Sequence, residues 1–292
     1  MASLAKNSQM PEVLAKDDYL QLVRSALAED VGSGDVTTMS LIAKDSFASG
    51  VIVAKEPLVM AGVDLAIASF REIEESIDFG VEVLDGQDGD FFQPLLRIHG
   101  PARALLTAER TALNFIQRLS GIATLTAKFV QQVAGTDAKI LDTRKTIPGW
   151  RILEKYAVAC GGGTNHRIGL YDQVMIKDNH LIAMGGDIKK AVDSVRKNYP
   201  KLKVEVEADT AQQAKTAAEA GADIILLDNM SRDELCQSIE LISGRSKTEA
   251  SGGITIDTVR EIAETGVDYI SIGALTHSAP AVDIGFDFDQ LS

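Results

Sequence analysis

Strand-like and helix-like segments alternate along the chain from residue 139 to residue 272. Such alternation predicts a parallel sheet with right-handed crossovers. Because no Gly-x-Gly-x-x-Gly turn follows any of the six predicted strands, the pattern favours a barrel over a dinucleotide-binding sheet. The predicted strands cover residues 139–142, 173–177, 203–207, 223–227, 248–251 and 269–272, and the predicted helices between the later strands cover 187–198, 210–220, 231–243 and 255–265.

Residues 17–134 show a different pattern of apolar residues. Residues 17–30 carry apolar side chains at helical spacing. Short apolar stretches broken by Gly, Asp and Pro follow between residues 47 and 106, and they predict an antiparallel sheet around one helix near 63–76. A long helical stretch then runs over 107–134.

Charge and composition exclude several classes of protein. The formal net charge is −13, which argues against nucleic acid as a partner. No apolar run approaches the roughly 20 residues that a membrane span needs, so we expect no membrane partner. The first residues show no apolar core and no Arg-rich pattern, so we expect neither a signal nor a transit peptide. Cys160 and Cys236 fit no metal-ligand spacing and are interpreted as reduced thiols of a cytoplasmic protein.

One window departs from this acidity. Within residues 139–180, seven Lys and Arg residues outnumber the acids, and the Gly161-Gly162-Gly163 run lies among them. A cationic pocket in an anionic protein indicates a small polyanionic ligand. Glycine can also let a backbone approach such a ligand closely.

The ends of the predicted strands carry polar residues that share one face. Side chains alternate between the two faces of a strand, so the face that carries polar residues points inward, away from the covering helices. In barrel enzymes the chemistry lies at the carboxyl ends of the strands. The residues placed inward in pairs are Met175 with Lys177, Glu205 with Glu207, Glu249 with Ser251, and Ser271 with Gly273.

Cations follow the first predicted strand and the glycine run. Arg144 and Lys145 can clamp a carboxylate or phosphate, or they can form a solvated loop pair balanced by Asp142. His166 and Arg167 suit a planar dianion, or the glycines can form only a turn beside a surface histidine. Together with Arg144 and Lys145, they favour the anion site.

Lys177 ends an apolar strand and has three possible roles. It can bind an anion, form a Schiff base if it is desolvated, or extend from the barrel rim into solvent. The neighbouring Asp178 keeps the amine charged, which favours anion binding.

Glu207 and Asp228 end successive strands. Carboxylates there can accept hydrogen bonds from sugar hydroxyls, bind Mg²⁺ through water or stabilise a developing carbocation. They can also form internal ion pairs with Lys177 or Arg144, which would be structural.

Small residues follow the last two strands. Glycine-rich turns that lead into helices form a phosphate cup in many barrels, although they also serve as ordinary turns. His277 can add a donor to such a cup or lie at the surface. The turn residues concerned are Ser251, Gly252, Gly253, Gly273 and Ala274.

The order of these segments resembles the quinolinate phosphoribosyltransferase family over residues 20–289. The resemblance rests on long and specific blocks: ALAEDVGSGDVTT, ERTALNFIQRLSGIAT, DTRKTIPGWRILEKYAVACGGGTNHRIGLYD, IKDNH, EVE, LLDN, SGGI and SIGALTHS.

The resemblance implies an α/β fold with an N-terminal α/β sandwich and an incomplete, six-stranded α/β barrel. We expect the sandwich over residues 1–115, where residues 276–292 can also pack, and the catalytic barrel over 116–275. The implied reaction joins quinolinate to phosphoribosyl pyrophosphate with Mg²⁺, and it gives nicotinate mononucleotide, pyrophosphate and CO₂ in de novo NAD biosynthesis.

The resemblance also implies the roles of individual residues. The quinolinate carboxylates are expected to meet Arg110, Arg144, His166, Arg167 and Lys177. Lys145, Glu207 and Asp228 are the expected catalytic residues, and the two acids also face the ribose and its metal. The phosphate cradle is expected to comprise Ser251, Gly252, Gly253, Gly273, Ala274 and His277. Arg110 is expected in the site of a neighbouring subunit, so the expected unit is a homodimer or a higher oligomer built from it.

Three other functions stay open. The chain can act on a different ring or be an inactive paralogue. It can be a Schiff-base aldolase that uses Lys177. It can also be a non-catalytic sensor of a phosphate ligand, although the inward acids Glu207 and Asp228 would weaken a pure anion site.

Overall fold

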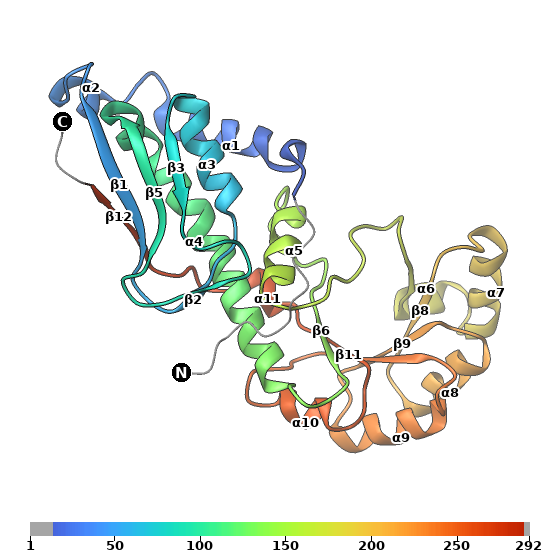
Figure 1. Cartoon of the computed structure of the whole chain (residues 1–292). Coiled ribbons are helices and arrows are strands. Elements are labelled where there is room, and N and C mark those ends of the chain that lie inside the picture. Colours follow the sequence, from blue (N-terminus) through green and yellow to red (C-terminus); the bar gives the residue numbers. More distant parts are fainter. Residues whose placement is uncertain (1–13, 289–292) are drawn as a thin grey trace. The chain divides into compact units, whose positions relative to one another are not determined.

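The computed structural model describes residues 14–288, and the chain divides into two compact units (Figure 1). Within the described residues, the first unit comprises 14–127, 147–162 and 278–288. The second unit comprises residues 128–146 and 163–277. The domain boundary expected after residue 115 falls inside the long helix α4 (Ala102–Gln132).

The first unit is built on a four-stranded antiparallel sheet with strand order β12-β1-β5-β3. Its strands are β1 (Phe47–Ala54), β3 (Asp78–Val81), β5 (Pro94–Pro101) and β12 (Ile284–Phe288). Strand β12 comes from the far end of the chain and pairs with β1, with Gly50 opposite Phe288. The antiparallel sheet expected between residues 47 and 106 is therefore present, although β12 was not predicted as a strand.

Helices complete this unit. The expected helices over 17–30, 63–76 and 107–134 correspond to α1, α3 and α4, while α2 and α5 were not predicted. The buried core includes Ile52, Phe70, Ile98, Leu105 and Ile116, so side chains from the sheet and from α3 and α4 meet there. The remaining elements are α1 (Lys16–Val31), α2 (Val36–Leu41), β2 (Leu58–Val59), α3 (Val63–Ile73), β4 (Asp88–Gly89) and α5 (Arg151–Cys160).

The second unit contains a six-stranded parallel sheet with strand order β6-β11-β10-β9-β8-β7. Every predicted strand is present with its ends within one residue of the prediction. In the described residues, the edge strands β6 and β7 are not paired with each other, as expected of an incomplete barrel. The strands are β6 (Lys139–Leu141), β7 (Val174–Ile176), β8 (Val204–Ala208), β9 (Ile224–Asp228), β10 (Lys247–Ser251) and β11 (Tyr269–Ser271).

Helices follow the strands and pack against them. Helix α8 contacts both β8 and β9, and Val204 and Val206 of β8 are completely buried. The starts of α8 and α9 are encoded locally, because Thr210 with Gln213 and Ser231 with Glu234 form capping boxes. The helices are α6 (Asp178–Ala183), α7 (Ile188–Asn198), α8 (Ala211–Glu219), α9 (Arg232–Ile242), α10 (Val259–Ala263) and α11 (Ala274–His277). The α/β fold class is thus confirmed.

Within residues 14–288, no helix combines the length and the apolar character that a membrane crossing requires.

Helix α4 packs closely against the segment around Pro280, and Gly121 makes this contact possible. A Cβ atom at Gly121 would overlap the carbonyl oxygen of Pro280 in the same unit. Alanine in place of glycine inside a helix ordinarily stabilises by about 0.5–1 kcal/mol. Because of the overlap, we expect Gly121→Ala to lower the unfolding free energy by about 1–3 kcal/mol, measured by urea denaturation.

Gly80→Ala is the matched control, because its Cβ would lie 3.6 Å from the Arg97 Cβ, an ordinary contact. Its stability is expected to stay within about 0.5 kcal/mol of the wild type. A Gly121→Ala protein that is as stable as the wild type would contradict this packing.

Candidate active site

A cavity of about 690 Å³ opens at the carboxyl ends of the parallel strands, within the second unit. Each of the six strands contributes to its wall within two residues of its last residue. The sequence-predicted residues that line the cavity are Arg144, Lys145, His166, Arg167, Lys177, Glu207, Asp228, Ser251, Gly252, Gly253, Gly273, Ala274 and His277. The structure therefore brings together every predicted site residue except Arg110.

Arg110 lies on α4 in the first unit. Its guanidinium is 3.7 Å from the Glu109 carboxylate, which is the pairing expected of an exposed helix arginine. Its role in the site of a neighbouring subunit stays a prediction.

The glycine run contributes to packing instead of lining the cavity. A Cβ atom at Gly161 would overlap the carbonyl oxygen of Ala123 on α4, so the glycine lets the end of α5 approach α4 within the first unit.

Arg167 is the most buried cation of the wall. Its side chain donates from Nη1 to the Gln173 carbonyl at 3.2 Å and from Nη2 to the Met175 Sδ at 3.5 Å. Burial first, and the nearby charge of Arg144 second, lower its pKa. Two cations at one wall, one of them almost buried, form a strong site for an anion.

Asp142 shapes the loop that carries these groups. Its carboxylate is fully buried and accepts hydrogen bonds from the Asn165 Nδ2 at 2.6 Å and from the backbone N–H of His166 at 2.8 Å. Asp142 therefore orients the loop, a role beyond the charge balance considered from sequence.

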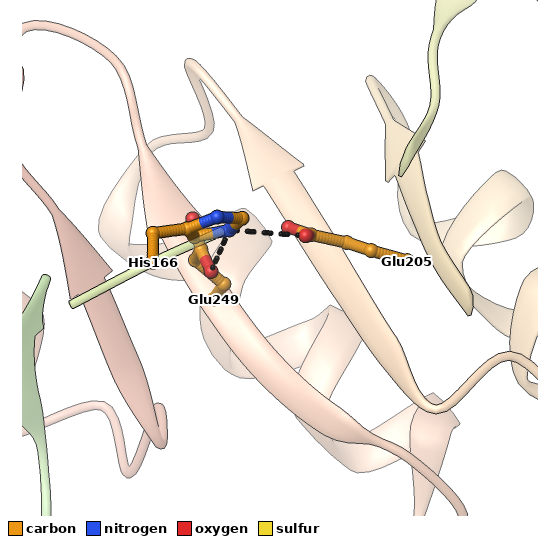
Figure 2. Close-up of side chains that lie close together, drawn as sticks. All are labelled: His166, Glu205 and Glu249. Atoms are coloured by element: carbon orange, nitrogen blue, oxygen red, sulfur yellow. Dashed lines mark ion pairs between the residues drawn. The ribbon is translucent and has the colours of Figure 1, made fainter. Parts of the chain in front are cut away.

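Figure 2 shows a buried triad, which we define as His166, Glu205 and Glu249. The His166 Nε2 lies 3.0 Å from the Glu205 Oε2 and 3.4 Å from the Glu249 Oε2. Both glutamates are at most 1% exposed. Burial lowers the pKa of His166, but the hydrogen bonds and charges of the two glutamates outweigh this effect and raise it to about 10. Burial, and then the charge of Glu249, raise the pKa of Glu205.

Lys177 and Glu207 face each other across two adjacent strands. The Lys177 Nζ is 3.4 Å from the Glu207 Oε2, so the ion pair considered from sequence is present. The Lys177 side chain is 47% exposed, which is unlike the desolvated amine that Schiff-base chemistry needs.

The turn after β9 interlocks with the turn after β10. Asn229 donates from Nδ2 to the Asp228 carboxylate at 2.6 Å, and its backbone N–H donates to the Ser251 carbonyl. Gly252 has φ of +99°, and a Cβ there would overlap the Asn229 Oδ1. Glycine at this position is therefore required both by the backbone conformation and by the neighbouring side chain.

The turn after β11 is equally close to its neighbours. A Cβ at Gly273 would lie 2.9 Å from the Lys145 Cδ and 3.2 Å from the His277 ring. The Thr276 hydroxyl donates to the Lys145 carbonyl at 2.7 Å, which ties the two turns together. His277 thus lies beside Lys145 at the cavity.

The strand alternation already pointed Glu205 and Glu249 inward, but it did not predict that they would contact His166. That contact depends on the loop after α5, which brings His166 close to Glu205 of β8 and Glu249 of β10. Thr143, Asn229 and Thr255 also line the cavity and were not predicted as site residues.

Models of a known family match both parts of the chain. The N-terminal domain of quinolinate phosphoribosyl transferase matches residues 35–120, and the C-terminal domain matches residues 122–287.

Known proteins resemble the chain over most of its length. It is 43% identical to the probable nicotinate-nucleotide pyrophosphorylase [carboxylating] of Bacillus subtilis over 91% of this chain and 92% of the relative. It is 44% identical to the corresponding protein of Mycobacterium leprae, over 91% and 95%. The solved nicotinate-nucleotide pyrophosphorylase of Francisella tularensis superposes with a TM-score of 0.91 at 38% identity, covering 97% of this chain and all of that one. The chain therefore belongs to the quinolinate phosphoribosyl transferase family.

Proposed function

We propose that this protein transfers the phosphoribosyl group of phosphoribosyl pyrophosphate to quinolinate and decarboxylates the product in NAD biosynthesis. The observation that carries the proposal is one cavity whose lining combines cations, which include Arg144, Arg167 and Lys177, with carboxylates and glycine turns. A dicarboxylate and a sugar phosphate need both kinds of surface in the same cavity. The names of the relatives support the same reaction.

The cationic wall suits the two carboxylates of quinolinate. Arg144 and Arg167 present guanidinium groups that can each bind a carboxylate through two bonds, and Lys177 adds a point charge. Held in this way, the ring nitrogen is oriented toward the second half of the cavity, and positioning of both reactants provides much of the rate enhancement.

The second wall suits the phosphoribosyl donor. The turns at Gly252 and Gly273 present backbone at close range to phosphate, with Lys145 and His277 beside them. Glu207 and Asp228 face the cavity from neighbouring strands, where their charge can stabilise an oxocarbenium ion at the ribose.

The reaction needs no side-chain nucleophile. The bond from the ribose C1 to the pyrophosphate oxygen breaks and pyrophosphate leaves with the electron pair. The pyridine nitrogen then donates its lone pair to C1. The resulting pyridinium accepts the electrons of the carbon–carboxylate bond when CO₂ leaves, and that ring carbon finally takes up a proton. Removing water from the carboxylate favours the loss of CO₂.

We include Mg²⁺ in the proposal. Glu207 and Asp228 offer hard oxygen donors at the ends of paired strands β8 and β9, which is the type of ligand Mg²⁺ prefers. These two residues would hold the ion, directly or through water, and a bound Mg²⁺ would offset the negative charge of the pyrophosphate leaving group.

The proposal includes a homodimer with Arg110 completing the neighbouring site, and a location in the cytoplasm. The exposed side chain of Arg110, whose partner is the adjacent Glu109, supports the first part. The free thiols of Cys160 and Cys236 support a reducing compartment.

Turnover with defined substrates tests the reaction. With quinolinate and phosphoribosyl pyrophosphate we expect release of pyrophosphate and CO₂ in equal amounts, measured by coupled phosphate detection and by ¹⁴CO₂ from carboxyl-labelled quinolinate. Nicotinate, which lacks the 2-carboxylate, serves as the control and should give no product. Equal turnover of both acids, or no turnover by the folded protein, would contradict the proposal.

The cationic wall makes a prediction about substrate affinity. Arg144→Ala and Lys177→Ala should each raise the KM for quinolinate by about 10- to 100-fold, since a lost charge-assisted bond costs about 1.5–3 kcal/mol. Their melting temperatures should stay close to that of the wild type.

Lys215→Ala is the matched control. It removes the same charge from an exposed pair with Glu219 on α8, outside the cavity lining. It should leave the KM for quinolinate unchanged, and an unchanged KM in both cavity variants would refute the assignment of the wall.

The acidic pair makes a prediction about metal dependence. Protein treated with EDTA should release no pyrophosphate until Mg²⁺ is restored. Glu207→Gln or Asp228→Asn should raise the Mg²⁺ concentration for half-maximal activity by about 10-fold, because one hard, charged ligand is lost. Glu264→Gln, in an exposed pair with Arg260, is the control and should not shift it. Full activity in EDTA would remove Mg²⁺ from the proposal.

A further inference from the structure

The buried triad places two carboxylates directly beneath a site that binds anions. Glu205 and Glu249 are almost completely buried, and Glu249 also lines the cavity. Negative charge here works against binding of a dicarboxylate, and its burial is costly without compensating bonds. The burial of these two glutamates is therefore best explained by the side chains that they contact and orient.

The first group is the His166 ring, whose two nitrogens both face protein atoms. The backbone N–H of Arg167 donates to the Nδ1 at 2.7 Å, so this nitrogen carries a lone pair. In a neutral ring the hydrogen then lies on Nε2, which faces the Glu205 and Glu249 oxygens at 3.0 and 3.4 Å (Figure 2). A metal ion at the triad would need the Nε2 lone pair, which this tautomer does not offer.

The raised pKa of His166 favours an imidazolium, which would place a second hydrogen on Nδ1 against the Arg167 N–H. In either protonation state of the ring, the Nε2 carries a hydrogen that faces the two glutamates. The Nδ1 hydrogen bond and the ion-pair distances at Nε2 therefore describe a ring whose Nε2–H is directed toward the two glutamates.

The second group is Gln173, which connects Glu205 to Arg167. The Gln173 Nε2 donates to the Glu205 Oε2 at 2.7 Å. The Gln173 backbone carbonyl in turn accepts from the Arg167 Nη1 at 3.2 Å. One carboxylate thus holds the His166 ring directly and the Arg167 guanidinium through a single intermediate residue. The charge of Glu205 also raises the pKa of Arg167, against the lowering effect of burial and Arg144.

We propose that Glu205 is a positioning residue for the dicarboxylate half of the site: it orients the His166 ring and, through Gln173, the guanidinium of Arg167. His166 then contributes to substrate binding by its fixed place in the wall, with its ring hydrogen directed into the protein. The role of Glu205 is confined to one half of the cavity, because within residues 14–288 its polar contacts are with His166 and Gln173 and not with the turns after β10 and β11. The inference rests on the proposed function for the identity of the ligand.

The test is the variant Glu205→Gln, which keeps the shape of the side chain and removes its charge and one acceptor oxygen. We expect the KM for quinolinate to rise by about 10-fold or more, as for loss of a bond to a charged group. The KM for phosphoribosyl pyrophosphate should change by less than about twofold, because the phosphate turns do not depend on this carboxylate.

Glu154→Gln is the matched control. Glu154 is also a fully buried carboxylate, and it accepts from the Arg118 Nη2 at 2.8 Å and from the Ile147 N–H at 3.1 Å within the first unit. The same change there should lower the melting temperature without separating the two KM values. If Glu205→Gln leaves both KM values unchanged, or raises them equally, the proposal is overturned.

Two further measurements keep the test decisive if Glu205→Gln does not fold. Gln173→Ala leaves the carboxylate in place and breaks only its link to Arg167, so it should raise the KM for quinolinate alone. In the wild-type protein, ¹⁵N-edited NMR of the His166 ring should show a hydrogen on Nε2, the nitrogen that faces Glu205. A ring without a hydrogen on Nε2 overturns the proposal. The NMR result does not need turnover, so it separates this inference from the proposed function, which fails if the wild type does not use quinolinate.

Discussion

The parallel register of the six strands in the second unit is the constraint on which the site depends. Strands that run in one direction end at one edge, and the alternation of side chains then directs every second residue into the same space. Glu207 and Asp228 reach one cavity because β8 and β9 are paired neighbours. Lys177 joins them from the position directly after β7, which pairs with β8 on its other side.

A second constraint is the balance between the positive charges that line the cavity and the buried carboxylates near them. Cations such as Arg144 and Arg167 line the cavity, and the acids Asp142, Glu205 and Glu249 near them are all buried. Asp142 accepts a hydrogen bond from the backbone N–H of His166, and Glu205 and Glu249 lie 3.0 and 3.4 Å from the Nε2 of that residue. The acids therefore hold the cations in place and offset their mutual repulsion, which lets like charges such as Arg144 and Arg167 stay close.

Much of the fold was predictable because its signals are local. The six strands were found from short apolar runs, and the capping boxes at Thr210 and Ser231 mark helix starts in the sequence itself. Strand β12 and helix α5 were not predicted. Strand β12 is stabilised by pairing with β1, which lies more than two hundred residues away along the chain. Helix α5 ends at Gly161, where a side chain would overlap α4. Contacts between segments that are far apart in the chain cannot be predicted from the local sequence pattern of either segment.

The sequence by itself determined the alternating architecture, the inward face of each strand and the residues at the strand ends, because periodicity and strand direction are properties of the chain. Only the tertiary structure decided that Glu205 and Glu249 meet His166, that Lys177 pairs with Glu207, and that Gly161 serves packing. These outcomes depend on which loop crosses which strand end and at what distance. Spacing along a sequence carries no such information, since residues far apart in the chain come into contact only when the sheet and its covering helices are assembled.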